Sequence, residues 1–404
     1  MALSLNRTRP HPRSLAIGAL ITVLVALGQI ATALYIPSMP SLVAALGTDA
    51  TQVNLTFSVF LVGFAVSQIV YGPLSDRFGR RRVLLAGLIL YLAASLGCAF
   101  APTIEVLIAG RLLQAMGACA GPVLGRAIVR DVYRGAEIAR VMAYIGIAFS
   151  VSPAITPLIG GYLQVWFGWR ANFIVLAVLA FAVLAATWTM LDETNPRLDS
   201  EATRPARLAI TFSSFLVSPV YVGHMLSVAF VFSGLMAYTA ASPFLFIERL
   251  GLTPDRYGML ALFTVAGYLA GTLAAGRLTM RLGIARMVLA GNLIALAGGL
   301  AMMAPIAFGH LSVAAVILPM MVFLAGMGMV LPNSMAGAMA PFPEAAGAAS
   351  ALLGLMQMAA AATASILVGH LSHDTQGPLA VVVTGLAALS LVSFLALVWR
   401  RRRP

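Results

Sequence analysis

Long apolar runs alternate with short polar segments along the whole chain. Each run is long enough to cross the hydrocarbon core of a bilayer as an α-helix, which needs about 20 residues. Strands of a membrane barrel would be shorter and would alternate in polarity. The pattern therefore predicts an all-α membrane protein with twelve transmembrane helices. The expected spans are residues 15–37, 52–73, 83–101, 104–127, 138–163, 171–191, 216–241, 258–278, 286–306, 312–333, 346–369 and 377–399.

One polar stretch interrupts this rhythm, after the sixth run, and reads DETNPRLDSEATRPAR. It predicts an N-terminal six-helix bundle at residues 1–191, a cytoplasmic linker at 192–215 and a C-terminal six-helix bundle at 216–404. The two bundles are expected to be pseudo-symmetric, because short motifs recur at a constant offset of 204 residues. The recurring pairs are Leu46-Gly47 with Leu250-Gly251, Gly72 with Gly276, Arg77 with Arg281, and Gly79 with Gly283.

Composition and charge support a membrane location. Of 404 residues, 61% are hydrophobic and 9% are charged, whereas soluble domains carry about 25% charged residues. This excludes a soluble enzyme, a disordered chain and a nucleic-acid-binding module. The net charge of +12 comes from Arg alone, and a cytoplasmic N-terminus places 21 Arg residues on the cytoplasmic side and 3 on the other. The positive-inside rule then predicts that both termini are cytoplasmic.

The loop after the second span contains a dense motif, Gly72-Pro-Leu-Ser-Asp76-Arg77-Phe-Gly79-Arg80-Arg81. The glycines allow a tight turn with close helix approach. The Asp76 carboxylate can pair with a neighbouring Arg or face a helix N-terminus, and such contacts are expected only when the cytoplasmic side is closed. We therefore expect a conformational latch, weaker in the second half, where Met280 replaces Asp76. The latch residues are Gly72, Asp76, Arg77, Gly79, Arg80 and Arg81, joined by Arg130 and Asp131 after the fourth span.

This loop resembles the major facilitator superfamily signature G-x-x-x-D-R-x-G-R-[KR], which it matches completely. Span four is similar to a second superfamily motif from Arg111 to Ala118, except that Ala115 replaces Gly. Span five resembles the antiporter motif G-P-x-x-G-G, with Thr156 in place of the first Gly. The segments around Tyr35 to Pro40, Ala240 to Glu248 and Pro343 to Gly354 are similar to the bicyclomycin/chloramphenicol-resistance subfamily of drug–proton antiporters. The resemblance implies drug export by alternating access, with span five sealing the interface between the two halves around Pro153, Pro157, Gly160 and Gly161.

Arg111 is informative without any family, because a charge near the middle of the membrane costs about 2.5–3.5 kcal/mol by insertion scales. Two interpretations stay open: an Arg in the substrate cavity, or a buried Arg bonded to helix carbonyls. The cavity itself is expected to be apolar and aromatic with few polar groups. The candidate substrate-binding residues are Gln29, Thr32, Tyr35, Arg111, Gln114, Met116, Phe149, Phe232, Met236, Tyr238, Asn333 and Gln357.

Span one departs from the subfamily at one position. The resemblance implies an acidic residue in T-D-x-Y-x-P, and this chain has Ala33 there. None of the other acidic residues is central in a span. The candidates for proton coupling are therefore the Ala33 position, Arg111 and Glu248. Three explanations stay open: a substitution introduced at residue 33, a natural variant that uses Glu248 or Arg111, or an uncoupled exporter.

The sequence thus predicts a secondary active multidrug exporter of a bacterial inner membrane, coupled to the proton gradient as an antiporter. The alternative is an exporter of a small metabolite such as a nucleoside or an amino acid, with or without coupling to protons, since one fold serves many substrates. No HExxH, phosphate loop or nucleophile elbow is present, so the chain is not expected to be an enzyme. Expected partners are small amphipathic molecules and the lipid bilayer, with no nucleic acid, metal or cofactor, and the protein is expected to be a monomer.

Overall fold

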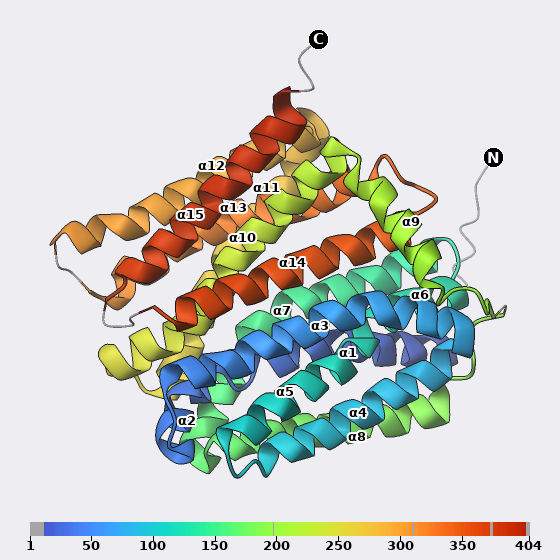
Figure 1. Ribbon diagram of the computed structural model, residues 1–404, viewed down its shortest axis with the longest axis horizontal. Helices are drawn as coiled ribbons and strands as arrows, with labels where there is room; N and C mark the ends of the chain where they lie inside the picture. The colour runs from blue at the N-terminus through green and yellow to red at the C-terminus, as the bar shows by residue number, and fades with distance from the viewer. Residues whose placement is uncertain (1–11, 197, 309–310, 372–374, 401–404) are drawn as a thin grey trace, which may run out of the picture.

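The computed structural model describes residues 12–196, 198–308, 311–371 and 375–400 of the chain. Within these residues, twelve helical segments are long and apolar enough to cross a membrane, which confirms the predicted number. They form two bundles that lie side by side, with the blue-to-green N-terminal bundle below the yellow-to-red C-terminal bundle in Figure 1. The chain is an all-α, multi-pass membrane protein.

The N-terminal bundle holds six spans, two of which are broken into shorter helices. Its elements are α1 (Pro12–Ala33), η1 (Ile36–Ser38), α2 (Met39–Leu46), α3 (Ala50–Phe78), α4 (Arg80–Ala99), α5 (Ile104–Ala118), α6 (Ala120–Val132), α7 (Ala136–Phe167) and α8 (Trp169–Met190). Proline explains both breaks, because it has no N–H to bond the carbonyl four residues earlier. Pro37 therefore leaves the carbonyl of Ala33, where α1 ends, without its helical donor, and Pro122 does the same at the end of α5.

The C-terminal bundle also holds six spans. Its elements are α10 (Pro219–Pro243), η2 (Phe244–Arg249), α11 (Pro254–Leu282), α12 (Ile284–Met303), η3 (Ala304–Phe308), α13 (Val313–Met339), α14 (Ala346–Gly369), α15 (Gly377–Phe394) and η4 (Leu395–Trp399). The predicted repeat extends to the backbone. Gly47 and Gly251 have φ angles of 60° and 68°, and Gly79 and Gly283 have φ angles of 96° and 80°. These are conformations that glycine adopts without steric cost.

The linker between the bundles differs from the expected polar connector. It contains a helix, α9 (Pro205–Leu216), which packs against α10 and α14 and lies between the bundles at the right of Figure 1. Pro205 occupies the first turn of α9, where a missing N–H costs nothing. Because α9 runs to Leu216, the seventh span begins at Pro219 and not at residue 216.

The halves meet along two pairs of long helices, α3 with α14 and α7 with α11. We call the end of the molecule where α1 begins the terminal end, and the end that holds α2 and η2 the opposite end. At the opposite end, α2 contacts η2, and the Thr51 hydroxyl donates to the Gly369 carbonyl across the halves at 3.2 Å. Contacts between the halves therefore close the opposite end.

Candidate functional site

A cavity of about 140 Å³ lies between the two halves. The N-terminal half contributes residues of α1, η1 and α7, and the C-terminal half contributes residues of α10, α11 and α13. Most of the lining is apolar, and Pro153 and Pro157 of α7 form part of the wall. The polar side chains of the lining are Gln29, Thr32, Ser150, Tyr238, Thr239, Tyr257, Thr264 and Tyr268. The cavity can therefore hold a small molecule through ring contacts and a few hydrogen bonds.

Half of the expected substrate-binding residues line this cavity. They are Gln29, Thr32, Phe149, Phe232, Met236 and Tyr238, and Ala33 lies beside them. The other six lie elsewhere. Tyr35, Arg111 and Gln114 are buried inside the N-terminal bundle, and Met116 is exposed on the surface of α5. Asn333 is buried and accepts a hydrogen bond from Thr279 at 3.0 Å, while Gln357 of α14 is half-buried outside the lining.

Arg111 is fully buried, and the structure supports the second of its two interpretations. One terminal nitrogen donates to the Ala31 carbonyl of α1 at 3.1 Å and to Gln114 Oε1 at 2.5 Å. The guanidinium carbon lies 4.2 Å from the ring centres of both Tyr35 and Phe60. The guanidinium thus joins α5 to α1 and α3 and does not line the cavity. The expectation of a cavity Arg is wrong for this conformation, because the aromatic rings stabilise the cation inside the bundle.

The second proton-coupling candidate also lies away from the cavity. Glu248 belongs to η2 at the opposite end, where its side chain is exposed. Of the three positions proposed for coupling, only Ala33 lines the cavity, and it has no titratable group. The site therefore contains no carboxylate among its lining residues.

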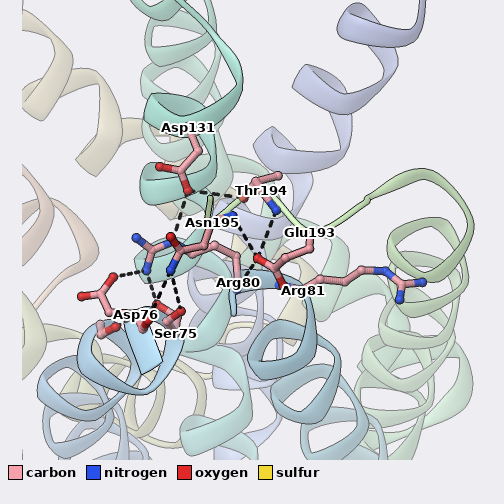
Figure 2. Close-up of polar contacts among 9 residues, drawn as sticks. Ser75, Asp76, Arg80, Arg81, Asp131, Glu193, Thr194 and Asn195 are labelled. Atoms are coloured by element: carbon pink, nitrogen blue, oxygen red, sulfur yellow. Dashed lines mark hydrogen bonds and ion pairs between the residues drawn. The ribbon is translucent and has the colours of Figure 1, made fainter. Parts of the chain in front are cut away.

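A second group of polar side chains surrounds Arg80 at the terminal end, as Figure 2 shows. Arg80 lies 2.6 Å from an Asp76 carboxylate oxygen and 3.2 Å from an Asp131 oxygen, and it also bonds Ser75 Oγ. Of the Arg80 and Asp131 side chains, 14% and 20% are exposed. Arg80 thus links α3, α4 and α6 within the N-terminal half, so the expected pairing of Asp76 with a neighbouring Arg is present.

Glu193 in the linker is a residue that the sequence analysis missed. Its carboxylate accepts hydrogen bonds from the backbone N–H groups of Arg80 and Arg81 at 2.8 and 3.2 Å, at the N-terminus of α4 (Figure 2). A Cβ at Gly79 would lie 2.4 Å from a Glu193 oxygen. Gly79 is therefore required both for its positive φ and for this close approach. The sequence offers one sign of this role, an acidic residue directly after the sixth span.

The other loop residues fix the linker to the N-terminal bundle. Arg77 donates to the Thr203 hydroxyl at 2.7 Å. Arg81 donates to the carbonyls of Leu191 and Trp188 at 2.7 and 2.8 Å. The predicted latch residues therefore hold the first part of the linker, and these contacts all lie on the N-terminal side of α9.

A larger vestibule of about 580 Å³ opens beside this group at the terminal end. Residues of both halves line it, including Gly72, Asp76, Arg126, Arg130 and Met339. The halves are therefore separated at the terminal end and in contact at the opposite end. The described conformation is open toward the terminal end, and the latch contacts are formed in it. This contradicts the expectation that they form only when that end is closed, because the partners of Arg80 all belong to one half.

The predicted interface kink in α7 packs against both halves. A Cβ at Gly160 would lie 1.8 Å from the Leu34 carbonyl oxygen, and one at Gly161 would lie 2.4 Å from the Pro254 carbonyl oxygen of α11. From the other side, a Cβ at Gly258 would lie 2.5 Å from the Pro157 carbonyl oxygen. Backbone meets backbone here, as in membrane helices with small interface residues. This packing closes the cavity toward the opposite end.

Comparisons with known proteins agree with this geometry. A family model described as Major Facilitator Superfamily matches residues 20–365. The multidrug resistance protein D of Escherichia coli is 31% identical over 94% of this chain and 95% of its own length. A chloramphenicol resistance protein of Pseudomonas aeruginosa is also 31% identical, over 89% of this chain and 87% of its own. Among solved structures, a D-xylose-proton symporter has a TM-score of 0.75 at 18% identity, over 95% of this chain and 97% of that one.

Proposed function

Because the chain belongs to the Major Facilitator Superfamily, we propose that it is a secondary active exporter of drug-like molecules that works by alternating access. The cavity carries this proposal. It lies between the two halves, its wall is apolar and aromatic, and the halves close over it at one end only. Rocking of one half against the other would expose the same wall at the other end. Two full-length relatives are named for multidrug and chloramphenicol resistance, which supports a drug as cargo.

The test is resistance of an efflux-deficient bacterium that expresses the protein, measured against a panel that includes chloramphenicol. Ala261 lines the cavity, so Ala261→Phe should fill it and abolish resistance at equal expression. Ala182→Phe is the control, because Ala182 is exposed on α8. Resistance that survives Ala261→Phe would contradict transport through this cavity. No resistance to any toxic compound would favour the alternative cargo, a small metabolite.

We propose that the proton gradient drives export by antiport, without a bound cofactor. The absence of any carboxylate from the cavity lining favours a second candidate, an uncoupled exporter that follows the gradient of its substrate. Reconstituted vesicles separate the two. Antiport requires uptake to rise at least several-fold when a proton gradient is imposed and to fall when an ionophore removes it. An uncoupled exporter gives equal rates under both conditions.

We also propose that the protein is a monomer in a bacterial inner membrane, with the terminal end in the cytoplasm. The Arg-rich loops after α3, α6 and α11 and the group around Arg80 lie at that end. Ser200 and Gln52 are exposed at the terminal and opposite ends, so a single Cys at either position can be labelled. In intact cells an impermeant maleimide should label Gln52→Cys and not Ser200→Cys. The native Cys98 and Cys119 are buried and should give no background. The reverse labelling would invert the orientation.

A further inference from the structure

Charge is distributed unevenly around the cavity. None of the residues that line it is charged. Helix α1 contributes Gln29, Thr32 and Ala33 to the wall of the cavity. On the same turn, the carbonyl of Ala31 accepts a hydrogen bond from Arg111. The wall and the buried guanidinium therefore share one turn of helix. An α-helix is only about 10 Å across, so the cavity lies within the field of this cation.

Nothing in the described part of the chain neutralises that cation. Arg111 is fully buried, its hydrogen-bond acceptors are a carbonyl and an amide, and the aromatic rings beside its guanidinium are those of Tyr35, Phe60 and Phe173. None of the ion pairs formed among the described residues includes Arg111. An Arg side chain stays protonated, and water and salt screen a buried charge much less than a surface charge. The positive charge therefore acts on whatever occupies the cavity.

The vestibule at the terminal end carries charges of both signs. Arg80, Arg126 and Arg130 line it together with two acidic residues, Asp76 and Asp199. Arg80 is paired with both Asp76 and Asp131, whereas the Arg126 Nε donates to the backbone carbonyl of Pro122. Asp131 offsets the third Arg, so the vestibule has no excess of either sign, and the buried Arg111 alone sets the sign of the charge at the uncharged wall.

We propose that the cavity selects its substrates by the sign of their charge: it accepts neutral and anionic amphipathic molecules and rejects organic cations. This inference rests on the proposed function, since it names the substrate class of the same site. The position of Ala33 is decisive. A carboxylate there would line the cavity two residues along α1 from the Ala31 carbonyl that accepts from Arg111, and it would offset the cation. With Ala33, the aromatic faces of the wall remain available for apolar contact, but a cationic ligand finds no counter-charge.

Tetraphenylphosphonium and tetraphenylborate test this directly, because they have nearly the same size and shape and opposite charge. Binding of each is measured by calorimetric titration into the purified protein in phosphatidylcholine nanodiscs, with empty nanodiscs subtracted. We expect tetraphenylborate to bind at least tenfold more tightly than tetraphenylphosphonium, which corresponds to about 1.4 kcal/mol. Ala33→Asp should lower this ratio at least tenfold. Ala33→Asn adds the same volume without charge and should leave the ratio within about twofold.

The change in ratio between variants is the deciding quantity, because partition of the probes into lipid is the same for all three proteins. Equal or tighter binding of tetraphenylphosphonium by the unmodified chain would overturn the inference. So would a lack of measurable tetraphenylborate binding, or a shift in Ala33→Asn as large as that in Ala33→Asp. Export of neutral compounds is the separate test of the proposed function. If neutral compounds are exported and the charge preference is missing, this inference alone fails.

Discussion

Replacement of Gly258 by Ala should shift the protein away from the conformation described above. The added Cβ would lie 2.5 Å from the Pro157 carbonyl oxygen and 2.8 Å from Leu158 Cα, and both are backbone atoms of the other half. Ordinary contact begins near 3.4 Å, so α7 and α11 must separate by about 1 Å, and overpacking of this kind costs about 1–3 kcal/mol. The cost arises only while the opposite end is closed, because only then do these helices touch there.

A difference of about 1–3 kcal/mol changes the ratio of two conformations by about 5- to 150-fold. The assay is a pair of spin-label distance measurements in nanodiscs. One pair joins Gln52 and Arg256 at the opposite end, and the other joins Arg134 and Arg281 at the terminal end; all four side chains are exposed. In Gly258→Ala the first distance distribution should lengthen and the second should shorten. Both changes should occur together, since rocking couples the two ends.

Two glycines of the same helix provide controls. A Cβ at Gly276 meets nothing within 4 Å, so Gly276→Ala should leave both distance distributions unchanged. A Cβ at Gly271 would lie 1.9 Å from the Ala325 carbonyl oxygen of α13, inside the C-terminal half. Gly271→Ala should therefore lower thermal stability without favouring either end. Unchanged distances in Gly258→Ala, or equal shifts in all three variants, would refute the idea that this contact holds the opposite end closed.

Four further substitutions probe other contacts. Asp76→Asn should reduce transport in vesicles at normal expression, because Arg80 loses one of its two carboxylates; full transport would leave this loop with only a topological role. Glu193→Gln should weaken its bonds to the start of α4 by about 0.5–1.5 kcal/mol, seen as faster limited proteolysis of residues 191–204, and an unchanged rate would contradict this. Arg111→Lys should abolish transport and lower the stability by about 2 kcal/mol, since Lys lacks the planar group that contacts the rings of Tyr35 and Phe60; a wild-type melting temperature would show that a point charge suffices. Asn292→Ala should destabilise the C-terminal half by about 1–3 kcal/mol, because it leaves the buried Ser227 and Ser390 hydroxyls without their shared amide, and an unaltered thermal melt would argue otherwise.

The sequence predicted the fold well because hydropathy alone determines where a chain crosses a bilayer. The number of spans, the two halves and the relation to drug-resistance proteins are confirmed. The repeat was visible because Gly79 and Gly283 occupy a backbone conformation that disfavours other residues. The helix α9 was not predicted, because the polar stretch that ends at Arg207 led us to assign residues 192–215 to a linker, although the residues after Arg207 are largely apolar.

The site was less predictable because the sequence indicates how deep a residue lies in the membrane but not toward which neighbours its side chain points. Gln29 and Arg111 are both polar groups expected near mid-membrane, yet one lines the cavity and the other lies among Tyr35 and Phe60. Met116 lies between the buried residues Ala115 and Gly117 of α5, but its own side chain is exposed. The role of Glu193 depends on how the linker folds back onto α4, and no local pattern encodes that contact.

Because most of the linker packs on one bundle or the other, the flexible connection between the two bundles is much shorter than the sequence suggests. Contacts with the N-terminal bundle extend as far as Thr203, and α9, which begins at Pro205, packs on α10 and α14 of the other bundle. The part of the linker that contacts neither bundle is then limited to one or two residues around Arg204. Extended backbone spans only about 3.3–3.6 Å per residue. The travel of one half relative to the other at the terminal end is limited accordingly, unless the bonds of Arg77 or the packing of α9 give way. An insertion at Arg204 would lengthen the flexible connection and allow the halves to move further apart at the terminal end. The same insertion between Asp192 and Thr203 would lengthen a segment that is bound to the N-terminal bundle, and it would leave this limit unchanged.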